Sequence, residues 1–396
     1  MGARRRPGEP ALDRRRRRPA RRRAAGRRRA RQRRGLHRPR RPRVHPRAGR
    51  HRRPRGGGGG VVSRRRTSLR HGLLLVDKRP GPTSHDVVDM ARRALHERRI
   101  GHTGTLDPMA EGLLVLCIGH ATRLQQFLVR WEKTYRGQIR LGHATTTYDG
   151  EGEPADPRGA VPELDGAVMA RLEGRFIGEL AQAPPPYSAK KIGGKRMYEL
   201  ARAGHPAVAE PKAVTVHALA LEALERDLLG VQVTVSSGFY VRSLAHDLGT
   251  ELGCGGYLGQ LQRVSIGPYL ADDAIPQSLL ETADDPELIV SQQGWIPIDR
   301  VTLPFPELQL NRTASERFAH GQEVVVLRSG GGPLAVDNEV AVRSAGGQLL
   351  GVGLVQSVLA RGRTVGIRPS MVLQASETQP AQPADSNSTV ASGETS

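Results

Sequence analysis

The sequence predicts an α+β fold, with strands and helices intermixed over about 71–297 and a small β-barrel-like module after it. Three observations lead to this class. The apolar run 113–118 suits a buried strand, and residues 133–141 alternate with a two-residue period. Residues 241–252 carry apolar side chains at helical spacing. The chain of 396 residues is long enough for roughly two or three domains.

The elements before residue 120 follow from apolar runs and turn residues. The expected order is a strand at 71–77, a Pro/Gly turn at 78–83, a helix with Ser84 as its N-cap, a loop at 101–112 and a strand at 113–118. Further along, the alternation over 133–141 places Tyr135 and Ile139 on one face of a strand. A helix at 167–176, strands at 214–223 and 229–236, and a helix at 241–252 closed by Gly253 complete this part.

The chain changes character around 277–298. In the unit at 298–375, Thr313 and Glu316 form a predicted capping box, and short β-like runs follow at 323–327, 339–342, 351–355 and 364–367. Residues 376–396 are rich in Ser, Thr, Gln, Pro and Ala, which predicts a disordered tail.

The excess positive charge is confined to the first 70 residues. They hold 30 arginines, no lysine and two acidic residues, a net charge of +28, whereas the remaining 31 basic and 37 acidic residues give −6. We expect 1–70 to be disordered, because it has too few apolar residues to offset the entropy of ordering. Two interpretations stay open: an RNA-binding arm, or a translated GC-rich upstream region with the true start near Val61, Val62 or Leu69.

Several classes of protein are disfavoured. No apolar segment follows the basic run as in a signal peptide, and no stretch approaches the roughly 20 apolar residues of a membrane span. Cys117 and Cys254 lie far apart without metal-ligand spacing, so we expect reduced thiols in a cytoplasmic protein. Zinc, phosphate-loop and serine-nucleophile motifs are absent from the sequence.

Asp107 is the strongest candidate for a catalytic residue. It lies in Gly-His-Thr-Gly-Thr-Leu-Asp-Pro-Met-Ala-Glu-Gly at 101–112, where glycines and Pro108 interrupt regular structure beside a predicted buried strand. Loops held on a rigid scaffold often carry catalytic groups. The alternative for an Asp before a Pro is an ordinary turn residue.

Other segments carry weaker signals. Residues 185–198 alternate basic side chains with tyrosines and glycines, which suits contact with phosphates and stacking on bases, or simply a solvated loop. Residues 236–242 (Ser-Ser-Gly-Phe-Tyr-Val-Arg) lie at a strand-to-helix junction that can present Tyr240 and Arg242 together. A core aromatic and a surface cation are the alternatives there, and Tyr135 needs no functional explanation as a half-buried tyrosine.

Taken together, these segments resemble the TruB family of tRNA pseudouridine synthases, bacterial enzymes that act at uridine 55 of the T loop. The resemblance runs in order over 71–270. Its blocks are Leu-Leu-Val-Asp-Lys (74–78), Gly-His-Thr-Gly-Thr-Leu-Asp-Pro (101–108), Lys133–Tyr135, Tyr-Ser-Ala-Lys (187–190), 238–242, Leu-Gly-Cys-Gly-Gly-Tyr-Leu (252–258) and Leu261–Arg263. Residues 298–373, with Phe-Ala-His-Gly-Gln at 318–322, resemble a C-terminal RNA-binding module of the PUA type.

The resemblance implies the fold, the domains and the reaction. The fold is a mixed, largely antiparallel central sheet flanked by helices. The catalytic domain covers 71–297, and the PUA-like domain covers 298–375. The reaction breaks the glycosidic bond of a uridine flipped out of the RNA loop and re-attaches the base through carbon. No cofactor and no metal are implied, because substrate and product are isomers. The expected partner is the T arm of tRNA, with no membrane, no protein partner and a monomeric state.

The resemblance also assigns residues. Asp107 matches the catalytic aspartate, Arg242 the arginine paired with it, and Tyr135 the tyrosine that packs on the uracil and handles a proton at its C5. The other substrate-binding positions are His102, which matches the histidine that holds the opened loop, with Lys78, Tyr240 and Leu261. The family pattern is departed from at Arg79-Pro80 and at Phe239. Whether Asp107 attacks the ribose, adds to the base or removes a ribose proton stays open.

Two alternatives come from other classes. One is an RNA-binding or tRNA-folding protein without catalysis, which would use the same surface. The other is a metal-dependent hydrolase built on His102, Asp107 and His120.

Overall fold

The computed structural model describes residues 70–187, 191–192, 195–196, 210–328 and 332–373. The predictions for the arginine-rich segment, for half of the basic segment at 185–198 and for the tail at 376–396 lie outside these residues. Everything below concerns the described part of the chain.

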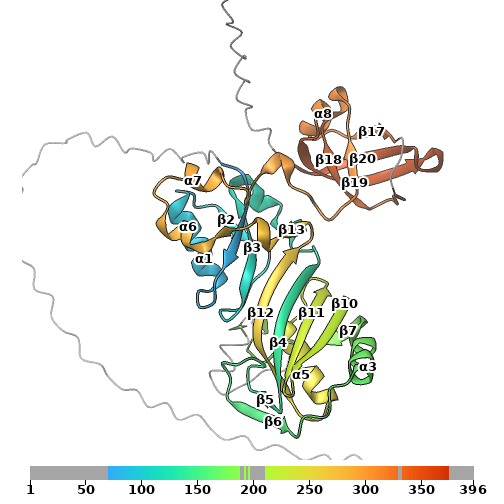
Figure 1. Ribbon diagram of the computed structural model, residues 1–396. Coiled ribbons are helices and arrows are strands. Elements are labelled where there is room, and N and C mark those ends of the chain that lie inside the picture. The colour runs from blue at the N-terminus through green and yellow to red at the C-terminus, as the bar shows by residue number, and fades with distance from the viewer. Residues whose placement is uncertain (1–69, 188–190, 193–194, 197–209, 329–331, 374–396) are drawn as a thin grey trace, which may run out of the picture. The chain divides into compact units, whose positions relative to one another are not determined.

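One large sheet forms the centre of the fold (Figure 1). Its path is β14-β1-β3-β12-β4-β11-β10-β7, with β13 paired to β12, β15 to β1 and β2 to β3. Only the pairs β1–β14 and β3–β12 of this sheet are parallel, so the predicted mixed, largely antiparallel sheet is confirmed. Its strands are β1 (Gly72–Lys78), β2 (Ile100–His102), β3 (Glu111–Ile118), β4 (Lys133–Leu141), β7 (Gly178–Gln182), β10 (Lys212–Glu225), β11 (Leu228–Val235), β12 (Gly256–Ile266), β13 (Tyr269–Leu270), β14 (Ile275–Pro276) and β15 (Trp295–Pro297).

Helices pack on this sheet at both ends of its path. Helix α1 contacts α6 and β2, α3 contacts β10, and α5 lies against β12. The helices are α1 (Ser84–Ala94), α2 (Gln125–Leu128), α3 (Gly166–Phe176), α5 (Val241–Glu251), α6 (Gln277–Thr282), α7 (Glu287–Val290) and α8 (Arg312–Ala319). Two small hairpins join β5 (His143–Thr145) to β6 (Pro154–Arg158) and β8 (Lys191–Ile192) to β9 (Lys195–Arg196). No helix in the described ranges is long and apolar enough to cross a membrane.

The hydrophobic patterns of the two central strands are borne out by burial. All residues from Leu113 to Ile118 in β3 are buried, as expected of a strand covered on both faces. In β4, Tyr135, Ile139 and Leu141 are buried while Arg136 is exposed, so the two-residue period correctly assigned the inner face. Cys117 and Cys254 are both buried and free.

Both predicted N-caps were wrong, by one residue in α1 and by two in α8. Thr83, not Ser84, caps α1: its hydroxyl accepts from the backbone N–H of Asp86, whose carboxylate in turn accepts from Thr83 N. Ser84 has another partner, Leu106 in the loop. In α8 the cap is Asn311, whose side chain accepts from Ala314 N, so the predicted box of Thr313 and Glu316 does not form.

A separate five-stranded sheet occupies the C-terminal region. Its order is β16-β18-β19-β20-β17, and the curled sheet fits the PUA-like module expected from the sequence. Its strands are β16 (Glu307–Gln309), β17 (Val324–Leu327), β18 (Glu339–Arg343), β19 (Leu349–Leu359) and β20 (Thr364–Val372). The last two run longer than predicted, because they pair along most of their length.

Helix α5 lies so close to β12 that one helical position has no room for a side chain. A Cβ at Gly249 would lie 2.1 Å from the backbone nitrogen of Gly256. We expect Gly249→Ala to lower the free energy of unfolding by about 1–3 kcal/mol, the usual cost of overpacking. Urea unfolding measures it. Gly174→Ala in α3, where nothing lies within 4 Å, is the matched control and should be neutral or stabilising.

Candidate active site

The loop that carries Asp107 is held in place through its own backbone. The chain is irregular between the end of β2 at His102 and the start of β3 at Glu111, so the loop is shorter than the predicted 101–112: Gly101 and Gly112 are accommodated in strands. The Ser84 hydroxyl donates to the carbonyl of Leu106 and accepts from its N–H, at 3.0 and 2.8 Å. Gly81 N donates to the carbonyl of Pro108 at 2.8 Å. The loop is therefore anchored on both sides of Asp107.

The side chain of Lys78 binds the backbone of the same loop. It is the last residue of β1 rather than part of a turn, and its side chain is fully buried. Its ammonium donates to the carbonyls of Ala110 at 2.7 Å and Pro108 at 3.2 Å. Burial lowers the pKa of Lys78 from 10.5 to about 8, although the nearby Asp107 opposes the shift.

Arg263 is a second buried cation under the loop. It is fully buried on β12, and its Nε donates to Leu113 O at 2.8 Å while Nη2 donates to Gly104 O at 3.1 Å. Arg263 was not predicted as a site residue, although it ends one of the blocks that carry the resemblance. Lys78 and Arg263 thus bind backbone carbonyl groups of the irregular loop and, through Leu113, of β3.

Asp107 and Arg242 form a bidentate ion pair. Arg242 Nε donates to Asp107 Oδ2 at 2.8 Å, and Nη2 donates to Oδ1 at 3.2 Å. The Arg242 side chain is 7% exposed, whereas 35% of the Asp107 side chain is exposed. The carboxylate therefore faces accessible space while its partner is held in the protein, and the planar fork sets the carboxylate's orientation.

A second carboxylate shares the guanidinium. Asp149 Oδ2 lies 3.3 Å from Arg242 Nη1, and the same nitrogen donates to the carbonyl of Thr147 at 3.0 Å. The Asp149 side chain is 6% exposed and accepts from Thr147 Oγ1 and Glu151 N. Asp149 was not predicted as a site residue; it opens the turn-like sequence Asp-Gly-Glu-Gly at 149–152. A turn motif gives no sign that its carboxylate contacts a helix 93 positions later.

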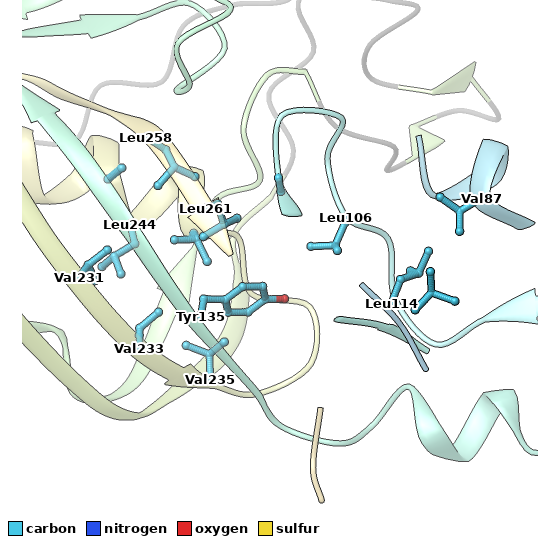
Figure 2. Packing of buried hydrophobic residues seen from close by; sticks show 14 of the residues in the cluster. Val87, Leu106, Leu114, Tyr135, Val231, Val233, Val235, Leu244, Leu258 and Leu261 are labelled. Atoms are coloured by element: carbon cyan, nitrogen blue, oxygen red, sulfur yellow. The ribbon is translucent and has the colours of Figure 1, made fainter. Parts of the chain in front are cut away.

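Tyr135 and Leu261 belong to the same buried hydrophobic cluster as Leu106. Figure 2 shows the Tyr135 ring beside Leu261 and Val235, with its hydroxyl pointing to the side on which Leu106 lies. Leu106 directly precedes Asp107, so the phenol faces the aspartate loop. Both Tyr135 and Leu261 are buried, at 8% and 7% exposure. Apolar side chains of this kind suit contact with the face of a nucleobase.

Tyr240 stands at the N-cap position of α5, two residues before Arg242. Its backbone is held at both polar groups by one buried side chain: Gln182 Oε1 accepts from Tyr240 N at 2.8 Å, and Gln182 Nε2 donates to Tyr240 O at 3.1 Å. Gln182 was not predicted. Its amide oxygen binds the Tyr240 N–H, which the start of a helix leaves without a backbone partner, and so helps to set where α5 begins.

Neither histidine of the metal hypothesis lies in the irregular segment that carries Asp107. His102 ends β2, half-buried, and burial lowers its pKa. His102 pairs with Leu116 of β3, and His120 follows the C-terminal end of that strand and stacks on His71, with 3.9 Å between ring centroids. An eight-residue strand spans roughly 26 Å, so His120 is far from the Asp107 loop. No group of three or more His, Cys, Asp or Glu side chains in the described residues could hold a metal ion.

Comparison with known proteins decides the family. Residues 92–241 match the family model described as TruB family pseudouridylate synthase, N-terminal domain, and residues 242–301 match that of the tRNA pseudouridylate synthase B C-terminal domain. A tRNA pseudouridine synthase B of Burkholderia mallei is 41% identical over 296 residues, which cover 74% of this chain and 96% of the relative. The chain belongs to the TruB family.

Two further similarities agree. A tRNA pseudouridine synthase B of Burkholderia lata is 44% identical over 257 residues, covering 65% of this chain and 78% of the relative. Among solved structures, a chain of the archaeal box H/ACA sRNP Nop10-Cbf5 complex superposes with a TM-score of 0.57 at 22% identity, covering 77% of this chain and 86% of that one. That likeness supports the fold. The TruB family assignment makes this chain an isomerase that forms pseudouridine in tRNA.

The buried Lys78 gives this TruB family member a testable pH dependence. Its pKa is about 8 in the folded chain and 10.5 when exposed, so the unfolded chain binds more protons between these values. Stability contributed through Lys78 therefore rises as the pH increases from 8 to 10.5. We expect the free energy of unfolding of the wild type, measured in urea, to increase relative to that of Lys78→Met as the pH rises over this range. A constant gap would contradict the buried position of the ammonium.

Proposed function

We propose that this chain converts uridine 55 in the T loop of tRNA to pseudouridine, with Asp107 as the catalytic carboxylate. The observation that carries the proposal is the bidentate pair of Asp107 with the buried Arg242, in a family of tRNA pseudouridine synthases. It leaves one carboxylate aimed at accessible space in a site otherwise made of apolar walls and buried cations.

The proposed reaction is a rearrangement of bonds within the uridine. The bond between N1 of the uracil and C1′ of the ribose breaks, and a bond between C5 and C1′ forms. The proton on C5 leaves and N1 gains one, so atoms and electrons balance without a co-reactant. In the proposed complex the uracil packs on Tyr135, whose hydroxyl handles the C5 proton, and Leu261 completes the wall.

The remaining predicted residues bind and position the substrate. We propose that His102 holds the opened T loop, and that Tyr240 and Lys78 shape the pocket, Lys78 through the loop carbonyls it binds. Extruding the uridine costs a few kcal/mol of lost stacking, which contacts with the flipped base offset. The PUA-like sheet would bind a further part of the tRNA.

We also propose a monomer that acts in the cytoplasm. Asp107, Arg242, Asp149 and Tyr135 all come from one chain, so the site is complete without a second copy. Its substrate is tRNA, and both thiols are free and buried, in keeping with a reducing compartment.

The test is product formation on a defined RNA. Purified full-length chain is incubated with a T-arm stem-loop that holds a single target uridine, with and without EDTA, and the nucleosides are separated by chromatography. We expect one pseudouridine per stem-loop at the same rate in both conditions. Binding of RNA without product would favour an RNA-folding role, and loss of activity in EDTA would favour a metal-dependent reaction.

A further inference from the structure

An aromatic stack joins the loop after β5 to α5, the helix that carries Arg242. The rings of Tyr148 and His246 are parallel within 8°, with 3.9 Å between their centroids. No hydrogen bond, ion pair or ring contact joins Tyr148 or His246 to Asp107 among the described residues, and the proposed function gives them no part. Each is nevertheless tied to Arg242 through its own segment of the chain.

Tyr148 lies between Thr147 and Asp149, the two loop residues that bind Arg242. Thr147 supplies a carbonyl and Asp149 a carboxylate oxygen, both to Arg242 Nη1. Their relative placement therefore depends on the backbone of the one residue that separates them. That backbone has φ +64°, a left-handed conformation that residues other than glycine rarely adopt.

His246 belongs to the element that carries Arg242 itself. Both residues are on α5, and a spacing of four places them on the same face of the helix, one turn apart. The loop at 147–149 binds the Arg242 guanidinium, and α5 carries Arg242. Contact between Tyr148 and His246 therefore joins this loop to α5. The loop is held on its other side by β12, because Leu258 N donates to Tyr148 O at 3.0 Å.

The stack is not explained by a polar role of the imidazole. His246 is half-buried, and its Nδ1 is buried without a hydrogen-bond partner among the described residues. Burial also lowers the pKa of His246, which favours the neutral ring that stacks well on a phenol. The ring face is thus the part of His246 that interacts.

We infer that Tyr148 and His246 are positioning residues, whose stack holds the 147–149 loop against α5 so that Arg242 keeps Asp107 in its reactive orientation. The inference rests on the proposed function. It goes beyond that function because it assigns catalytic importance to two side chains that do not contact the reacting groups. A displacement of catalytic groups by about 1 Å can cost about 100-fold in rate.

The test distinguishes three causes of a change in turnover: loss of the Tyr148 or His246 ring, a change in the backbone at Tyr148, and loss of a contact with RNA. kcat and KM are measured on the T-arm stem-loop for Tyr148→Ala, Tyr148→Gly, Tyr148→Phe, His246→Ala and the double variant Tyr148→Ala/His246→Ala. We expect kcat to fall by about 10- to 100-fold in both single alanine variants, with KM unchanged. Tyr148→Phe, which keeps the ring, should retain the wild-type rate. The double variant should be no slower than either single one, because both remove the same contact.

Tyr148→Gly is the most discriminating variant. Glycine adopts φ +64° without strain, so it keeps the backbone and removes only the ring. We expect it to be as slow as Tyr148→Ala. His120→Ala, which removes the equivalent stack of His71 and His120 away from Arg242, is the matched control and should keep the wild-type kcat.

Three results would overturn the inference: a wild-type kcat in both alanine variants, a wild-type kcat in Tyr148→Gly, or a rise in KM alone, which would mean that the ring contacts RNA. Unfolding curves exclude global unfolding as the cause, and His246→Ala probes the stack from the second element. An inactive wild type would instead refute the proposed function, so the two failures are distinct.

Discussion

Asp107→Asn should abolish turnover while leaving tRNA binding intact. Asparagine has nearly the same shape and can still accept from Arg242, but it cannot act as a carboxylate at the ribose or the base. We expect kcat to fall by about 10⁴-fold or more, the range seen when a central catalytic group is removed. Single-turnover formation of pseudouridine measures the rate, and filter binding measures the affinity for tRNA.

The control for this variant is Asp227→Asn. Asp227 lies in the turn between β10 and β11, with its side chain 54% exposed, so the same chemical change is made away from the site. It should keep the wild-type rate. A comparable loss in both variants would point to a general effect of the substitution, and near wild-type turnover in Asp107→Asn would refute the role of Asp107.

Arg242→Gln should lower both stability and turnover. It removes the positive charge between two carboxylates, one of which, Asp149, is 5% exposed and cannot regain water. Breaking a buried ion pair on one side costs about 3–5 kcal/mol. We expect a loss of that size in urea unfolding, with turnover lost as well because Asp107 is no longer oriented.

A second substitution separates the two effects. Adding Asp149→Asn to Arg242→Gln removes the uncompensated charge, so stability should largely return while turnover should not. Arg242→Lys should also be slow, because one ammonium cannot reproduce the planar fork that binds both Asp107 oxygens. An Arg242→Gln variant with unchanged stability would contradict the buried network.

Much of the fold could be predicted from local pattern. The apolar run of β3 and the alternation of β4 gave the correct elements, because burial on two faces or one leaves a period in the sequence. The cap of α1 was misassigned to Ser84 because Thr83 and Ser84 are adjacent hydroxyls with equal capping chemistry. Only the tertiary contact of Ser84 with Leu106 decides between them.

The central pair of the site, Asp107 and Arg242, was predicted from the sequence, whereas the residues that hold this pair and its loop in place were not. Asp107 and Arg242 could be named because they stand in distinctive blocks. Asp149, Gln182 and Arg263 could not, since each acts through partners far away in sequence, such as the 58 positions between Gln182 and Tyr240. A turn, a strand end and a strand interior do not reveal such contacts, because no local period encodes them.

The central claim is that this chain forms pseudouridine 55 through Asp107, and modification mapping tests it most directly. Total tRNA is taken from a strain that lacks the gene, complemented with the wild type or with Asp107→Asn, and pseudouridines are mapped at single-nucleotide resolution. We predict that the T-loop signal at position 55 is absent in the deletion strain, restored by the wild type and not restored by Asp107→Asn. A signal that persists in the deletion strain, or that Asp107→Asn restores, would contradict the claim.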